Sequence, residues 1–202
     1  NTFINGISTE EFNKGEFAGQ GFFPGDMTKL LFSDQMEPII FSPDVIQQSH
    51  LGLLAYEKPA VMLRNLRESV LGTARFDTAF REYIRRWAFK HPTPEDFFRT
   101  MENVAGEDLS WFWRAWVMNN WKLDQSVKSV SFNNNRLSAG ALITIENLQK
   151  MAMPVTVLVK QENGDSATIK LPVEIWQRGT EWTFHVPISS PVKEVILDPE
   201  NK

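Results

Sequence analysis

The apolar residues of the first 125 positions differ in kind from those of the last 77, and this asymmetry limits the folds open to the chain. Thirteen of the 15 phenylalanines and five of the seven tryptophans precede position 125. Valine and isoleucine together number 11 in the first 125 positions and 15 in the last 77. Aromatic-rich segments followed by β-branched segments indicate helices and strands in separate regions. We therefore expect an α+β fold with two domains, 1–124 and 125–202, in which antiparallel helices precede a small β-sandwich.

Helical spacing and capping signals predict the elements of the first domain. Residues 45–71 have the length and composition of a helix that ends at Gly72, and Pro59 should kink or interrupt it. The segment Thr93-Pro94-Glu95-Asp96 is typical of a helix start, and Gly106 of a helix end. Apolar residues repeat at helical spacing in two further stripes, which are Phe76, Phe80, Tyr83, Ile84 and Trp87, and then Leu109, Phe112, Trp113, Trp116 and Val117.

Residues 1–41 are predicted to be an irregular leader. Five of the 11 glycines fall in the first 25 positions, and Gly19-Gln20-Gly21 and Pro24-Gly25 are turn signals. The phenylalanines of this segment suggest a loop laid over an apolar surface; they are Phe12, Phe17, Phe22, Phe23 and Phe32.

The second domain shows the period-two alternation of strands. Asn163-Gly164 is a hairpin signal between two alternating runs. The alternating apolar positions are Val155, Val157, Val159, Ala167, Ile169, Leu171, Trp182, Phe184, Val186, Val195 and Leu197. Several short strands within about 75 residues predict a small β-sandwich.

Composition and motifs exclude several functions. The chain has no cysteine, so disulfides, thiolate zinc sites and a cysteine nucleophile are absent. A net charge of -4 argues against a nucleic-acid partner, and no apolar run is long enough for a membrane span. His50, His91 and His185 are far apart and form no H-E-x-x-H motif. The residues alone therefore identify no catalytic constellation.

A family resemblance is carried by three segments. Ala55-Tyr56-Glu57-Lys58-Pro59-Ala60, residues 87–98 and residues 106–116 together resemble the zinc aminopeptidases of the gluzincin type, peptidase family M1. The resemblance is specific over residues 43–125, and residues 126–202 are similar to the β-sandwich that follows the catalytic domain in these enzymes. The domain 1–124 is thereby identified as similar to the C-terminal helical part of the catalytic domain.

The resemblance implies a hydrolase in which zinc-activated water removes N-terminal residues from peptides. It implies one catalytic residue in this chain, Tyr56, which corresponds to the tyrosine that donates a hydrogen bond to the oxyanion. A phenol suits that role because its ordinary pKa is about 10, too high for a general base near neutral pH.

The zinc ligands and the catalytic glutamate of the family are missing from this sequence. We therefore expect zinc in the longer parent enzyme and none in this chain, which should be inactive alone. Its expected partners are the missing N-terminal catalytic segment and, in the parent, a peptide substrate. The alternative is a non-catalytic interaction module derived from such an enzyme.

Overall fold

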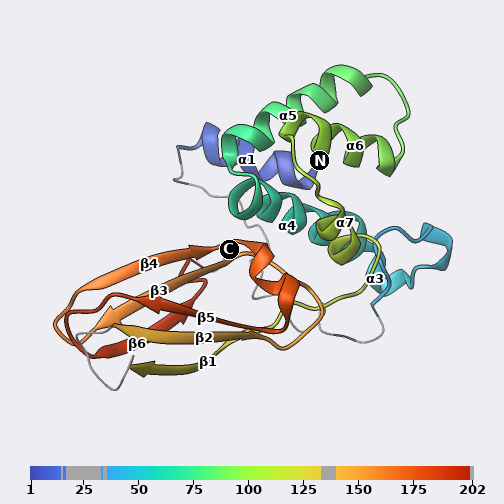
Figure 1. The fold of residues 1–202 in the computed structure, drawn as a ribbon. Coiled ribbons are helices and arrows are strands. Elements are labelled where there is room, and N and C mark those ends of the chain that lie inside the picture. The colour runs from blue at the N-terminus through green and yellow to red at the C-terminus, as the bar shows by residue number, and fades with distance from the viewer. Residues whose placement is uncertain (15, 17–32, 34–35, 133–139, 201–202) are drawn as a thin grey trace. The chain divides into compact units, whose positions relative to one another are not determined.

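The computed structural model describes residues 1–14, 16, 33, 36–132 and 140–200, and contacts divide the chain into two compact units. The first unit ends at Asn120 and the second begins at Trp121, close to the division at residue 124 that the composition suggested. Figure 1 shows helices in the first unit and two antiparallel sheets in the second. The predicted α+β fold is therefore confirmed.

The first unit is built from helices. Its elements are α1 (Thr2–Phe12), the 3₁₀ turn η1 (Pro43–Val45), α3 (Gln48–Gly52), the π turn η2 (Leu53–Glu57), α4 (Lys58–Asn65), a second π turn η3 (Leu66–Val70), α5 (Thr73–Trp87), α6 (Pro94–Ala105) and α7 (Ser110–Trp116). Short connections join those that follow one another from η1 to α7. None of the described helices combines the length and hydropathy needed to span a bilayer.

The predicted helix ends are present at α6. The backbone N–H of Thr93 donates to the Asp96 carboxylate at 2.9 Å, and Pro94 occupies the first turn. At the other end Gly106 adopts φ 67°, the left-handed conformation that glycine provides at helix ends. The start and stop signals in the sequence therefore place α6 correctly.

The irregular leader predicted for residues 1–41 is corrected at its start, because Thr2–Phe12 forms α1. Phe3 is buried and packs its ring 5.5 Å from Phe76 and 5.9 Å from Phe80 of α5, measured between ring centroids. This tertiary packing supplies what the local sequence lacks, since a short helix is marginal by itself. Phe12 is 88% exposed, so it covers no apolar surface among the described residues. Phe17, Phe22, Phe23 and Phe32 lie outside the described residues.

The second unit contains two three-stranded sheets over the described residues, with strand orders β1-β2-β5 and β4-β3-β6. The strands are β1 (Gln125–Phe132), β2 (Ala141–Asn147), β3 (Val155–Gln161), β4 (Ser166–Leu171), β5 (Glu181–Val186) and β6 (Val192–Leu197). All pairs are antiparallel, and the predicted hairpin at Asn163-Gly164 joins β3 to β4. The short 3₁₀ segment Val173–Arg178 lies between β4 and β5.

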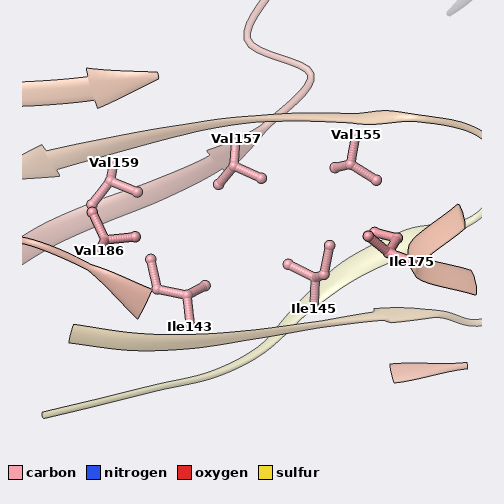
Figure 2. Close-up of a cluster of buried hydrophobic side chains, with 7 residues drawn as sticks. All are labelled: Ile143, Ile145, Val155, Val157, Val159, Ile175 and Val186. Carbon is pink, nitrogen blue, oxygen red and sulfur yellow. The ribbon is translucent and has the colours of Figure 1, made fainter. Parts of the chain in front are cut away.

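The core of this unit lies between the two sheets. Figure 2 shows the valines of β3 pointing toward the isoleucines of β2, with Ile175 and Val186 in the same layer. The seven buried side chains are Ile143, Ile145, Val155, Val157, Val159, Ile175 and Val186. Because alternate residues of a strand face the same way, one row from each sheet closes the sandwich. Trp176 and Trp182 pack against this cluster, as expected for core tryptophans.

Candidate active-site tyrosine

Tyr56 lies in the π turn η2, between α3 and α4. Its side chain is 60% exposed, and its hydroxyl makes no hydrogen bond with any residue in the described part of the chain. The turn is closed by the backbone N–H of Lys58, which donates to the carbonyl of Leu53. A free, outward-facing phenol on a helical frame is a group that can donate a hydrogen bond to a bound molecule.

Pro59 explains why the helix widens at this point. Proline has no N–H to donate to the carbonyl of Ala55, and in regular α geometry its ring would clash with that carbonyl. The backbone nevertheless stays in the right-handed helical region at Gly52, Leu53 and Lys58. The interruption predicted at Pro59 is therefore a wider turn within a continuous helix, and Tyr56 belongs to that turn. Such π turns often occur at functional sites.

Lys58 lies two residues beyond Tyr56, but its side chain is buried where that of Tyr56 is exposed. It is 3% exposed, and burial lowers its pKa from 10.5 to about 8. The buried positions of this helical run follow one another at intervals of four residues and are Leu54, Lys58, Met62 and Leu66. Lys58 thus occupies an apolar stripe, where a charged group is costly without a partner.

A carboxylate fixes the segment that leads into this helix. Glu37 accepts a hydrogen bond from the backbone N–H of Gln47 at 2.9 Å, and its second oxygen lies 2.7 Å from Nδ1 of His50. These two contacts, the backbone one first, hold the pKa of Glu37 below its ordinary value. They join residue 37 to the start of α3 and so fix the entry into the helix that carries Tyr56.

No group of three or more histidine, cysteine, aspartate or glutamate side chains that could hold a metal ion occurs in the part of the chain that the structure describes. His50 pairs with Glu37, His91 is exposed before α6, and His185 belongs to β5 in the other unit. The described residues therefore offer no set of ligands that fits a zinc ion.

The helical unit also has a hollow of about 370 Å³ between α6 and α7. Tyr56 is not part of it. Its lining residues are Glu95, Phe98, Arg99, Glu102, Ser110, Trp113, Arg114 and Met118. The Glu102 carboxylate is already hydrogen-bonded within the fold. It accepts hydrogen bonds from the Trp113 indole at 3.1 Å and from the Leu109 backbone N–H at 3.2 Å.

The family resemblance indicated Tyr56 as a candidate, but three features around it were not predicted, namely the π turn, the burial of Lys58 and the contacts of Glu37. The spacing of Leu54, Lys58 and Met62 was a usable signal for the second, since Lys58 interrupts an apolar stripe of a helix. The contacts of Glu37 depend on how the chain turns back between residues 37 and 50, which no spacing in the sequence indicates.

Comparison with known proteins shows a likeness between part of this chain and aminopeptidases. Residues 33–116 match the model described as the peptidase family M1 domain. Aminopeptidase M1-D and aminopeptidase M1-C of Oryza sativa subsp. japonica are each 33% identical over 64 residues, which is 32% of this chain and 7% of each relative.

A solved structure extends the likeness to nearly the whole chain at the level of fold. The crystal structure of Legionella pneumophila aminopeptidase A in complex with aspartic acid matches with a TM-score of 0.60 at 19% identity. The match covers 97% of this chain and 22% of that protein. These findings confirm the resemblance to a fragment of family M1 aminopeptidases, and the chain spans only a small part of each relative.

Proposed function

We propose, from the match of residues 33–116 to peptidase family M1, that this chain is the C-terminal part of an aminopeptidase that hydrolyses N-terminal residues from peptides. The parent enzyme would use a zinc-activated water, with its zinc ligands supplied by the catalytic segment that this chain lacks. This chain would supply one reacting group and would form the active enzyme together with that segment, its partner. It would be inactive alone.

The observation that carries the proposal is the position of Tyr56. The tyrosine within Ala55-Tyr56-Glu57-Lys58 is the residue that the resemblance assigns to catalysis. It is exposed, without a hydrogen-bond partner in the described chain, and lies in a turn of a helix. A neutral phenol in that position would donate its O–H to the carbonyl oxygen of the scissile bond as negative charge develops there. The donation is most effective when the donor is already in place, because no reorganisation is then needed during the reaction.

The test compares the 202-residue chain with a longer protein that joins it to the upstream segment. We expect the longer protein to retain zinc after dialysis and to cleave aminoacyl-anilides, and the chain alone to do neither. Metal analysis and initial rates on both proteins check this. A longer protein that folds and binds zinc but cleaves no N-terminal residue would contradict the proposal and favour the interaction module. One tightly held zinc per 202-residue chain would contradict the proposal that the upstream segment supplies the zinc ligands.

A further inference from the structure

The hairpin turn between β3 and β4 contains Asn163 followed by Gly164. In such a pair the backbone nitrogen of the second residue can attack the side-chain carbonyl carbon of the asparagine, and glycine hinders this attack least because it has no side chain. Both residues are exposed, so water reaches them. The sequence has one other pair of this kind, Asn5-Gly6, and it lies in α1.

Hydrogen bonds hold both reacting groups of the pair in the turn. The Asn163 amide nitrogen donates to the Asp165 carboxylate at 2.7 Å and to the Ser189 hydroxyl at 3.0 Å. The Asn163 amide oxygen accepts from the backbone N–H of Asp165 at 3.1 Å. The backbone nitrogen of Gly164, which would attack, donates to the carbonyl of Gln161 at 3.1 Å. Attack therefore requires that the Asn163 side chain leave its partners and that the turn open.

Ser189 is the partner that the tertiary fold supplies. Gln161 and Asp165 belong to the hairpin itself, whereas Ser189 lies between β5 and β6. Its hydroxyl lies 2.9 Å from the same Asp165 oxygen that Asn163 meets, and its backbone N–H donates to the Gln161 side chain at 2.7 Å. The restraint on Asn163 thus depends on the contact between the hairpin and the β5–β6 connection.

We propose that Asn163 is a site of spontaneous deamidation and that its contact with Ser189 sets the rate. The Gly164 nitrogen forms a bond to Cγ of Asn163, the bond from Cγ to Nδ2 breaks, and the amide proton of Gly164 leaves with the released ammonia. One water then opens the succinimide ring and gives aspartate or isoaspartate at position 163. Water is the only reagent, and the inference does not depend on the proposed function.

Either product places a negative charge beside Asp165. A carboxylate replaces the amide that donated to Asp165, so a hydrogen bond becomes a repulsion between like charges. Asn163→Asp reproduces the aspartate product, and we expect it to lower the thermal midpoint of the second unit by about 3 °C.

The experiment follows deamidation in the 202-residue chain, in Ser189→Ala and in a free peptide with the sequence of residues 161–170, all in mildly alkaline buffer. Trypsin releases the same segment from the chain, because it follows Lys160 and ends at Lys170, and it contains one asparagine. Chromatography with mass spectrometry separates the unmodified, aspartate and isoaspartate forms. We expect the folded chain to react at least about tenfold more slowly than the peptide, and Ser189→Ala about fivefold faster than wild type, the factor for one hydrogen bond.

Ser190→Ala is the matched control. The described hydrogen bond of Ser190 is made by its backbone N–H, which donates to Gln161 at 3.0 Å and is kept in the variant. Ser190→Ala and Ser189→Thr, which retains a hydroxyl, should both react near the wild-type rate. Asn5 in the same samples should react equally in every chain, since it lies in the first unit.

Three results would overturn the inference. Reaction of the wild-type chain as fast as the peptide would mean that the turn does not restrain Asn163. Equal rates in Ser189→Ala and Ser190→Ala, or a Ser189→Thr rate equal to that of Ser189→Ala, would mean that the Ser189 hydroxyl does not set the rate. Absence of both products from Ser189→Ala after several half-lives of the peptide would mean that Asn163 is not a site of deamidation.

Discussion

Tyr56 and Lys58 lie two residues apart on one helix, yet the side chain of Tyr56 is 60% exposed and that of Lys58 is 3% exposed. The π turn Leu53–Glu57 contains the tyrosine, and the lysine begins the regular helix that follows. One residue is therefore free to meet a ligand, while the other affects the stability of the fold. Because their environments differ, substitutions at the two positions should be separable by kinetics and by unfolding experiments.

Tyr56→Phe should lower turnover in the longer, zinc-bearing protein with little effect on folding. The substitution removes a hydroxyl that makes no hydrogen bond in the described chain, so the unfolding midpoint of the 202-residue chain should be nearly unchanged. Loss of an oxyanion donor costs on the order of 10²–10³-fold in kcat. Since the donation strengthens as the transition state forms, KM should change much less. Steady-state kinetics with an aminoacyl-anilide check this.

Zinc content serves as the control for that variant, because the phenol is not expected to be a ligand. Metal analysis should give the same zinc content for Tyr56→Phe and the wild-type protein. Turnover within a factor of about three of wild type, in a folded and fully metallated variant, would remove the catalytic role from Tyr56.

The stability of the 202-residue chain should rise with pH because of Lys58. Burial lowers the pKa of its ammonium from 10.5 in the unfolded chain to about 8 in the folded one. Between these values the unfolded state binds more protons, so the free energy of unfolding increases with pH, by at most about 3 kcal/mol. Below pH 8 the cost of the buried charge is present in full.

Urea unfolding of wild type and Lys58→Met at several pH values between 7 and 9.5 tests this. The difference between the two proteins isolates Lys58 from Tyr83, whose pKa is raised by burial and which also titrates at alkaline pH. We expect the variant to be the more stable protein at pH 7 and the difference to shrink as the pH rises. A difference that stays constant across this range would show that Lys58 is not desolvated.

The sequence predicted the elements that contain their own signals, namely apolar residues at helical spacing and capping residues at the ends. The stripe of Phe76 and Phe80 and the caps at Thr93 and Gly106 correspond to α5 and α6. Helix α1 was not predicted, because its stability depends on the packing of Phe3 against α5. The residues of α1 alone do not indicate that contact.

Strands β1 and β2 were not predicted individually. In β2 the alternation of Ala141, Ile143 and Ile145, all buried, was a readable signal. In β1 the residues are exposed or half-buried throughout, so the pattern carries little information about the fold. An edge strand of this kind is recognised from its partner in the sheet rather than from its own sequence.

The features of the candidate site also differ in whether the sequence predicts them. The family resemblance indicated Tyr56, and the sequence placed Pro59 within its helix. The opposite exposures of Tyr56 and Lys58 depend on which face of the helix meets α1 and the rest of the unit, and that packing is a tertiary property. The catalytic role of Tyr56 stays a prediction until the kinetic test is made.

Asp96→Ala should destabilise the helical unit by about 1 kcal/mol, the usual effect of losing a helix cap. The Asp96 carboxylate accepts from both the backbone N–H and the hydroxyl of Thr93, each at 2.9 Å. Glu95→Ala is the matched control, since Glu95 is a first-turn acid of the same helix and is exposed. Urea unfolding followed by helical circular dichroism measures both. Equal losses in the two variants would assign the effect to first-turn charge rather than to the cap.

Gly140→Ala should destabilise the β-sandwich by about 2–4 kcal/mol, because it combines backbone strain with a clash. Gly140 adopts φ 81° immediately before β2, and an added Cβ would lie 2.8 Å from the carbonyl oxygen of Val186 and overlap the ring of His185. Val186 pairs with Ala141, so neither strand can move away without breaking the ladder between β2 and β5.

Gly164→Ala separates the two contributions, since Gly164 has φ 92° but no atom within 4 Å of an added Cβ. That variant should lose only about 1 kcal/mol, the conformational cost alone. Thermal unfolding of both variants, followed by the signal of the sheet unit, provides the comparison. A larger loss for Gly140→Ala would locate the clash at the start of β2. Equal losses would mean that Val186 and His185 give way, and that the register between β2 and β5 is less rigid than the buried row of Ile143, Ile145 and Val186 indicates.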